Sequence, residues 1–331
     1  MFGYIVRRLI AGCLVVIAVT MMVFAIFYYG PNDPALAYCP ESRCTPQRLD
    51  NIRHALGLDQ SAPKQYLEYM GGYVHSRDIS AGGIDIHCKW PCMGVSFKYR
   101  VSVFDYLMAR VPATFAIAVG GAICFLILGI SSGVFAARRR GTLADKAIVS
   151  ASLFINAIPY YLLALLAYLY LVQGLGLFPE TGYYSPFHNS PLKFVGGLLL
   201  PWIMLGIAYS TQYARFSRGA MVDALNEDYV RTARAKGLAE RVVTRRHALR
   251  AAIVPVVTIF GLDFAYLLTG TIFTEKIFNI QGLGLAGLDA VQRTDLPMIS
   301  ATVMIGAAVI VVANIVVDIL YSVIDPRVRL S

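Results

Sequence analysis

Two glycine-rich patterns are the parts of this sequence most typical of an enzyme. Gly129-Ile-Ser-Ser-Gly133 fits the G-x-S-x-G pattern of a serine nucleophile. Such a nucleophile lies on a sharp turn between a strand and a helix, whereas residues 129–133 lie inside an apolar run long enough to be a membrane helix. Small residues in such a helix let a second helix approach closely. We therefore interpret the pattern as a packing site and keep an intramembrane enzyme built on Ser131 or Ser132 as a rival hypothesis.

The second pattern, Gly282-Leu-Gly-Leu-Ala-Gly287, spells the G-x-G-x-x-G of a dinucleotide-binding turn. No βαβ unit is predicted around it, so a tight turn or a short helix is the better interpretation. The sequence also lacks the G-x-x-x-x-G-K-[ST] of a P-loop and the H-E-x-x-H of a zinc protease. We expect a chain that performs no covalent chemistry and binds neither a metal ion nor a cofactor of its own.

Polar residues within the apolar runs are the remaining candidates for a functional site. Asp263 and Asp318 are costly inside a bilayer, so each is expected to face other helices, water or a partner. One interpretation places Asp263 on the wall of a translocation path, together with Asn156, Thr269 and Thr271. The alternative for each acidic residue is a hydrogen-bonded packing contact. An ion-driven secondary transporter that uses Asp263 is a second rival hypothesis.

Four cysteines lie in the polar segment 30–110: Cys39, Cys44, Cys88 and Cys92. So short a segment buries little core, and on the oxidising side of a membrane its cysteines are expected to form two disulfides. Three pairings are open, and a zinc site is the less favoured alternative. We expect a small folded module that contacts an external partner or covers a pore. A receptor-like scaffold and a structural insertion without contacts are the alternatives.

The composition indicates which elements hold these residues. Of the 331 residues, 57% are hydrophobic and 15% are charged, whereas soluble domains carry about 25% charged residues. Six apolar runs each reach the roughly 20 residues that a membrane helix needs, and helices are expected because lipid cannot hydrogen-bond an exposed backbone. The runs lie near Leu9–Tyr29, Val111–Ala137, Ala147–Gln173, Phe194–Ala214, Ala251–Thr274 and Met298–Ile324.

Basic residues predict the orientation of these helices, because Lys and Arg are enriched on the cytoplasmic side. Arginines flank the first, second and sixth runs on one side: Arg7, Arg8, Arg138, Arg139, Arg140, Arg327 and Arg329. Both termini are therefore expected in the cytoplasm. The first run exceeds the apolar core of about 7–15 residues in a signal peptide, so we expect an uncleaved helix. The basic surplus is explained by topology and docking rather than by nucleic-acid binding.

The loop between the fourth and fifth runs carries most of the net charge. Residues 215–250 hold nine Lys/Arg and four Asp/Glu, which is five of the chain's nine net positive charges. Asn226 is a typical N-cap and Gly237 a typical C′ stop, so a short helix is predicted over residues 226–237. A second helix is predicted from about Ala239. A charged, structured loop of this kind is expected to bind a soluble partner; an amphipathic connector at the lipid surface is the alternative.

This loop resembles that of the inner-membrane permease subunits of ABC importers, in the dipeptide, oligopeptide and nickel branch. The stretch Tyr229-Val-Arg-Thr-Ala-Arg-Ala-Lys-Gly-Leu238, followed by Arg246-His-Ala-Leu-Arg250, is similar to that branch's form of the E-A-A-x3-G loop. Stretches elsewhere resemble the first-permease type: Tyr4-Ile-Val-Arg-Arg8, Gly30-Pro-Asn-Asp-Pro34, Leu56-Gly-Leu-Asp59, Leu268-Thr-Gly-Thr271, Gly282-Leu-Gly284 and Asp325-Pro-Arg327. The stretch from about Cys39 to Cys92 departs from the family pattern.

The resemblance implies the type I ABC importer permease fold. That is an all-α integral membrane protein with six transmembrane helices and, here, an extracytoplasmic disulfide-bearing insertion after the first. The implied organisation is an N-terminal helix at residues 1–29, the insertion at 30–110, a five-helix core at 111–324 with the coupling loop 215–250, and a cytoplasmic tail at 325–331.

The resemblance also implies partners and a location in the bacterial inner membrane. A homologous second permease would complete the pore, separate ATPase subunits would bind ATP and Mg²⁺, and an extracytoplasmic substrate-binding protein would deliver peptide. Nickel or another small solute is the alternative cargo. The residues implied to couple to the ATPase are Tyr229, Arg231, Thr232, Ala233, Arg234, Ala235, Lys236, Gly237 and His247.

Overall fold

The computed structural model describes residues 2–29, 34–37, 39, 44–55, 57–81, 84–96, 98–187 and 190–324. The chain divides into two compact units, of which unit 1 contains residues 1–114 and 282–312 and unit 2 contains residues 115–281 and 313–331. Some stretches singled out in the sequence lie outside the described residues: 30–33, Leu56, 325–331 and the side chain of Asp318.

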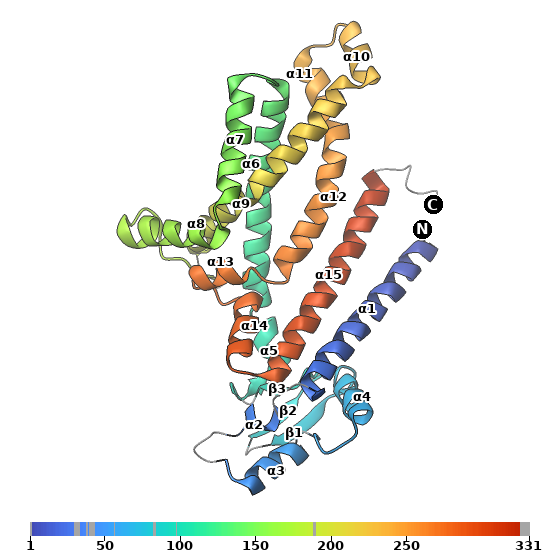
Figure 1. Cartoon of the computed structure of the whole chain (residues 1–331), viewed down its shortest axis with the longest axis vertical. Coiled ribbons are helices and arrows are strands. Elements are labelled where there is room, and N and C mark those ends of the chain that lie inside the picture. Colours follow the sequence, from blue (N-terminus) through green and yellow to red (C-terminus); the bar gives the residue numbers. More distant parts are fainter. Residues whose placement is uncertain are drawn as a thin grey trace. The chain divides into compact units, whose positions relative to one another are not determined.

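Unit 2 consists of helices joined by loops and turns, with no strand among its described residues (Figure 1). Helix α9 packs lengthwise against α7 and α12, and a short helix, α10, follows the end of α9. The elements are α6 (Val111–Arg138, of which the first turn belongs to unit 1), α7 (Leu143–Ala157), α8 (Tyr160–Ala167), the π-helix η2 (Tyr168–Gly174), α9 (Pro191–Asn226), α10 (Asp228–Ala235), α11 (Glu240–Val242), the π-helix η3 (Val243–Ala248), α12 (Leu249–Leu268) and α13 (Ile272–Ile277).

The G-x-S-x-G pattern lies in the C-terminal half of α6 and is a packing site, as predicted. A Cβ atom added at Gly129 would overlap the side chain of Tyr213, and one added at Gly133 would overlap that of Ser217, both on α9. The Ser217 hydroxyl donates to the Gly129 carbonyl at 3.2 Å. The Ser132 hydroxyl instead donates to its own helix, at the Leu128 carbonyl (2.6 Å). The glycines therefore let α6 and α9 approach closely.

Two predicted spans differ from a single helix. The fifth, Ala251–Thr274, is interrupted between the end of α12 at Leu268 and the start of α13 at Ile272. The third differs more. The chain leaves helical geometry at Ile158, whose ψ is 126°, and α7 and the α8–η2 segment meet at 91°. The cause is Pro159, which disfavours helical geometry in the residue before it. One continuous helix over Ala147–Gln173 was therefore the wrong expectation. Five described helices are long and apolar enough to cross a membrane, or six if the bent pair forms one span.

Unit 1 combines two long helices with a small mixed module (Figure 1). Two antiparallel two-stranded sheets pair β1 with β2 and β3 with β4. The all-α expectation is therefore wrong for this segment of the chain. The elements are α1 (Phe2–Tyr29), α2 (Pro34–Ala37), α3 (Pro46–Ala55), α4 (Ala62–Gly72), β1 (Arg77–Ala81), β2 (Ile84–Cys88), β3 (Val95–Ser96), β4 (Val101–Ser102), α5 (Val103–Met108), α14 (Leu283–Gln292) and α15 (Leu296–Ile324, whose last residues belong to unit 2).

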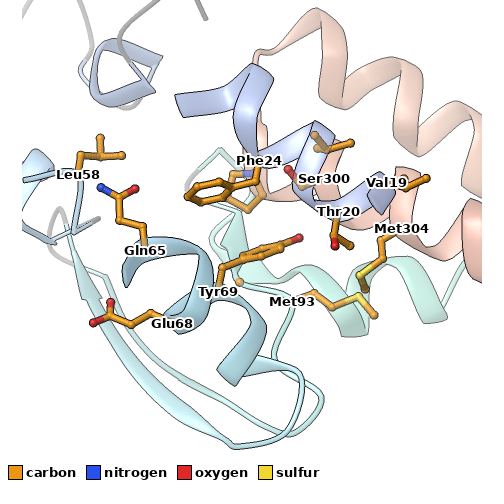
Figure 2. Close-up of a pocket in the computed structure, with 13 residues that line it drawn as sticks. Val19, Thr20, Phe24, Leu58, Gln65, Glu68, Tyr69, Met93, Ser300 and Met304 are labelled. Atoms are coloured by element: carbon orange, nitrogen blue, oxygen red, sulfur yellow. The ribbon is translucent and has the colours of Figure 1, made fainter. Parts of the chain in front are cut away.

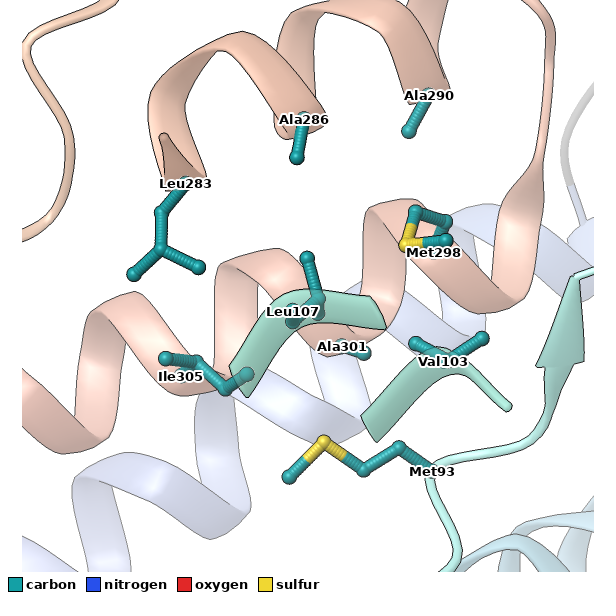
Figure 3. Close-up of a cluster of buried hydrophobic side chains, with 9 residues drawn as sticks. All are labelled: Met93, Val103, Leu107, Leu283, Ala286, Ala290, Met298, Ala301 and Ile305. Atoms are coloured by element: carbon teal, nitrogen blue, oxygen red, sulfur yellow. The ribbon is translucent and has the colours of Figure 1, made fainter. Parts of the chain in front are cut away.

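The core of unit 1 joins segments far apart in the sequence. Figure 3 shows Leu107 of α5 between Leu283 of α14 and Ala301 of α15. The short helix predicted at the G-x-G-x-x-G pattern is present as α14, and its Leu283 amide donates to the Thr114 hydroxyl at 2.8 Å. Burial of these apolar side chains gives the module a support that its own short strands cannot provide.

A buried carboxylate also ties the module to α15. Asp295, immediately before α15, is fully buried and accepts a hydrogen bond from the Ser96 hydroxyl of β3. Burial raises the pKa of the Asp295 carboxyl above its usual range. The hydrogen bond connects residues 199 positions apart, so it fixes the start of α15 against the module.

The close approach of α6 and α9 generates a stability prediction. Gly133→Ala should lower the free energy of unfolding by about 1–3 kcal/mol, because the new methyl group overlaps Ser217 and the Ala214 carbonyl. Gly219→Ala is the matched control, because a Cβ there meets no atom within 4 Å. The measurement is the melting temperature of each variant in detergent. Equal melting temperatures would contradict the close packing.

Candidate functional site

Helix α10 begins directly where α9 ends. Glu227, with ψ of 148°, occupies the N-cap position of α10 without a side-chain cap, and its carbonyl accepts from the Val230 amide at 3.0 Å. The N-cap prediction at Asn226 was wrong, because α9 continues through Asn226. The single extended residue between the helices sharply redirects the chain at this end of α9.

The other end of α10 has the predicted glycine stop. Gly237 has φ of +77°, a left-handed conformation that residues with a Cβ rarely adopt. The Gly237 amide donates to the Arg234 carbonyl at 2.9 Å, and the Leu238 amide donates to the Ala233 carbonyl at 3.4 Å. These bonds satisfy carbonyls that a helix end leaves free, so the turn into α11 is well defined.

One face of α10 is anchored. Val230 is fully buried and Ala233 is 4% exposed, and burial of a valine side chain stabilises by roughly 1.5–3 kcal/mol. Their apolar neighbours come from α6, α9, η3 and α12: Ala137, Met221, Ala224, Val243, Ala248 and Ala252. The helix is therefore fixed to the ends of the long helices of unit 2.

The opposite face of α10 is open to solvent and basic. We call the exposed residues Tyr229, Arg231, Thr232, Ala235 and Lys236 the α10 outer face. Arg231 lies 3.5 Å from Asp228, but both side chains are largely exposed, so this ion pair adds little stability. The cationic side chain stays available to an acidic partner surface.

Arg234 fixes α10 to α11 across the glycine turn. Its Nε and Nη2 donate to the two carboxylate oxygens of Glu240 at 3.1 and 2.9 Å, and its Nη1 donates to the Leu225 carbonyl at 3.4 Å. The planar guanidinium matches the carboxylate at two points. Arg234 is thus held by its neighbours within the loop, and its bonds reinforce the position of the helix.

Beside α10 lies an open groove that includes His247. Its lining carries charges of both signs, from Asp223, Glu227 and Arg250, and includes Tyr229. His247 is half-buried there. Of the residues that the resemblance singles out, His247 and Tyr229 therefore line the same groove, although the two are 18 positions apart.

A charge pair that the sequence did not reveal joins α7 to α9. Arg218 Nε and Nη2 donate to the Asp145 carboxylate at 2.5 and 2.8 Å, and the Gly141 amide donates to the same carboxylate at 2.9 Å. The Asp145 side chain is 4% exposed. This pair fixes α9 to α7 about three turns before α10 starts.

The candidate path residues are spread over several elements. Asp263 of α12 accepts a hydrogen bond from the buried Tyr213 hydroxyl of α9 at 2.9 Å. The Thr269 hydroxyl donates to the Tyr266 carbonyl at 2.8 Å, Thr271 precedes α13, and Asn156 is exposed near the end of α7. The contact of Asp263 joins two helices, as the packing alternative predicted.

The four cysteines of the module form two local disulfides, Cys39–Cys44 and Cys88–Cys92. The structure thereby selects one of the three pairings left open by the sequence. Cysteines bonded in this way are not available as zinc ligands. Among the described residues, no group of three or more His, Cys, Asp or Glu side chains is arranged to hold a metal ion.

Comparison with known proteins gives matches along the whole chain. Residues 126–330 match the family described as "Binding-protein-dependent transport system inner membrane component". Residues 1–118 match the family described as "Binding-prot-dependent transport system membrane comp, N-term".

Named relatives match over almost their full length. The chain is 34% identical to "Di/tripeptide transport system permease protein DppB" of Pseudomonas aeruginosa (strain UCBPP-PA14), with 99% of each chain covered. It is 33% identical to "Dipeptide transport system permease protein DppB" of Escherichia coli (strain K12), again with 99% of each covered. It is also 33% identical to "Probable peptide ABC transporter permease protein y4tP" of Sinorhizobium fredii, with 98% of this chain and 99% of that protein covered.

A solved structure has a related fold. A chain of the MetNI methionine ABC transporter, determined in inward-facing conformations, superposes with a TM-score of 0.53 and 14% identity. The match covers 67% of this chain and 97% of that one. At this identity the likeness concerns the fold alone.

The brace between α7 and α9 generates the second stability prediction. Arg218→Met should lower the free energy of unfolding by about 1–3 kcal/mol, because it leaves the buried Asp145 carboxylate without its cation. Arg231→Met, which breaks only an exposed pair, should change it by less than about 0.5 kcal/mol. Melting curves of both variants test the difference. Equal effects would show that the Asp145–Arg218 pair does not brace α9.

Proposed function

Because the chain belongs to the family of binding-protein-dependent transport system inner membrane components, we propose that it is a permease subunit of an ATP-driven peptide importer. It is a multi-pass inner membrane protein and a transport subunit rather than an enzyme. The observation that carries the proposal is the match to peptide permeases over 98–99% of the chain. The cargo named for these relatives favours peptide over nickel for this chain.

Coupling to ATP hydrolysis is assigned to α10. In this proposal the α10 outer face, with the adjoining Gly237 turn and His247, rests in a groove of a separate ATPase subunit, which binds ATP and Mg²⁺. The assignment is supported by the shape of the segment, since one face of α10 is anchored by Val230 and Ala233 while the other is free and basic. The positively charged side chains of the α10 outer face would attract an acidic surface on the partner.

Movement of α10 is passed on through rigid connections. The anchored face of α10 packs on α9, η3 and α12, and α9 runs without a break for 36 residues, a length of about 54 Å. A displacement of α10 would therefore tilt α9 and α12 together, and the loop between these two helices would not bend. The proposed transport step is such a rocking movement between inward-open and outward-open states.

The remaining features of the proposal concern topology and partners. Both termini and α10 lie in the cytoplasm, as the clusters of arginine favour, and the disulfide-bearing module lies outside. A second, homologous permease completes the path, and an extracytoplasmic substrate-binding protein delivers the peptide. Asn156, Asp263, Thr269 and Thr271 are the candidates for lining the path.

An ion-driven secondary transporter remains the rival to be tested. It requires Asp263 to exchange ions or protons, whereas the observed contact of Asp263 is a hydrogen bond to Tyr213 within the helix packing. Uptake that stops when the ion gradient is collapsed, and continues when ATP hydrolysis is blocked, would favour the rival.

A variant at the end of α10 tests the coupling. Gly237→Leu places a side chain on a residue with φ of +77°, at a cost of about 1–2 kcal/mol, and should lower ATP-driven peptide uptake by roughly tenfold. Membrane insertion should not change, because a Cβ at Gly237 meets no atom within 4 Å. Gly219→Leu on α9 is the matched control. Unchanged uptake by Gly237→Leu in proteoliposomes would count against coupling through α10.

A charge reversal tests the proposed contact. Arg231→Glu on the α10 outer face should reduce the amount of ATPase that copurifies in mild detergent, and the reduction should be smaller at high salt, because salt screens the lost attraction. Arg48→Glu makes the same change on α3 of the module and should leave copurification intact. Equal retention of the ATPase by both variants would exclude the outer face as its docking site.

A further inference from the structure

A pocket of about 160 Å³ lies within unit 1, away from every residue assigned above (Figure 2). Its walls come from α1, α4 and the start of α15, with Met93 and Gly94 between them. The pocket is about the size of an engineered cavity, of about 150 Å³, that holds a benzene-sized ligand. It can therefore accept a segment of a hydrocarbon chain or one side chain.

The walls of the pocket differ in polarity. Val19 and Val23 of α1 and Met304 of α15 belong to the apolar stretches Leu9–Ile26 and Leu296–Val316, which are long enough to cross a membrane. The wall contributed by α4 carries Gln65 and Glu68. In Figure 2, Gln65 and Glu68 lie at the end of the pocket away from Met304. An amphipathic ligand matches this arrangement, with its apolar part against the spans and its polar part beside α4.

The aromatic wall is held in place by the surrounding structure. The rings of Phe24 and Tyr69 lie 6.4 Å apart, centroid to centroid, and Phe24 packs edge-on against Tyr66 at 5.4 Å. The Tyr66 hydroxyl is 3.0 Å from the hydroxyl of Thr20, which is 3% exposed. These contacts fix α4 against α1, so the pocket exists before a ligand binds.

The surroundings indicate where a ligand would come from. The outer surface of α1 next to the pocket is apolar and exposed, with Met22 at 67% and Ile26 at 68%. A helix this apolar faces lipid, so acyl chains are the apolar groups at highest concentration beside the pocket. The one charged side chain among the described lining is the Glu68 carboxylate, which attracts an ammonium group and repels an anionic headgroup.

From these features we infer that the pocket binds an acyl chain of an amine-headgroup phospholipid taken from the surrounding leaflet. Part of one chain lies between Val23 and Met304, and the rest follows the exposed face of α1. The ammonium group lies at the Glu68 end. A lipid held there occupies the contact between α4 and the two membrane helices, so it supports the module where it meets the bilayer.

Photolabelling of the intact transporter in lipid nanodiscs tests the inference. The probe is a phosphatidylethanolamine with a diazirine in one acyl chain, and peptide mass spectrometry locates the label. We expect label on residues of α1, α4 and α15 that line the pocket. Ser300→Phe should fill the pocket and lower this label about tenfold, the factor expected when burial of about two methylene groups is lost. Val303→Phe adds the same ring to an exposed position of α15 and should leave the label unchanged.

A second variant keeps the test informative if Ser300→Phe fails to fold. Glu68 is exposed, and Glu68→Lys should reverse the headgroup preference, so that a diazirine phosphatidylglycerol labels the pocket more strongly than the ethanolamine probe. Label that is spread evenly over α1 in the unmodified protein would overturn the inference. So would the same headgroup preference in Glu68→Lys, or crosslinking of the pocket to a side chain of a protein partner in place of lipid.

Discussion

The burial of Val230 and Ala233 against α9, η3 and α12 is the contact on which the rest of the account depends. A helix of eight residues is not stable alone in water, so α10 exists because this face is buried. The same contact joins α10 to helices long enough to cross the membrane. Helix α10 therefore forms only when it is packed on the long helices. Its opposite, basic face stays available to a partner.

The bilayer explains why this attachment can transmit movement. Membrane helices satisfy their own backbone hydrogen bonds, and small residues let them pack closely, as Gly129 and Gly133 do between α6 and α9. The Asp145–Arg218 pair adds a second fixed point, between α7 and α9. We expect helices held in this way to move as a group, with bending at breaks such as the one before Pro159, where α7 and the α8–η2 segment meet at 91°.

Local signals in the sequence were sufficient for part of this structure. The stop at Gly237, the packing role of Gly133 and the short helix after Gly282 follow from residues within one or two turns. The Asp145–Arg218 pair spans 73 positions, so no local pattern could reveal it. The break before Pro159 did have a local signal, which the length of the apolar run concealed. The N-cap of α10 was misplaced because α9 continues through the polar residues where the apolar run ends.

The most direct test of the central claim is the distance between α10 and α9 during transport. Spin labels at Lys236 and Phe216, both exposed, can be measured by pulsed electron resonance in the assembled transporter, without nucleotide and with ATP trapped. The account predicts one narrow distance distribution that is the same in both states, because α10 moves together with α9. A distribution that broadens or shifts on ATP binding would show that α10 is a flexible tether, and the account would be wrong.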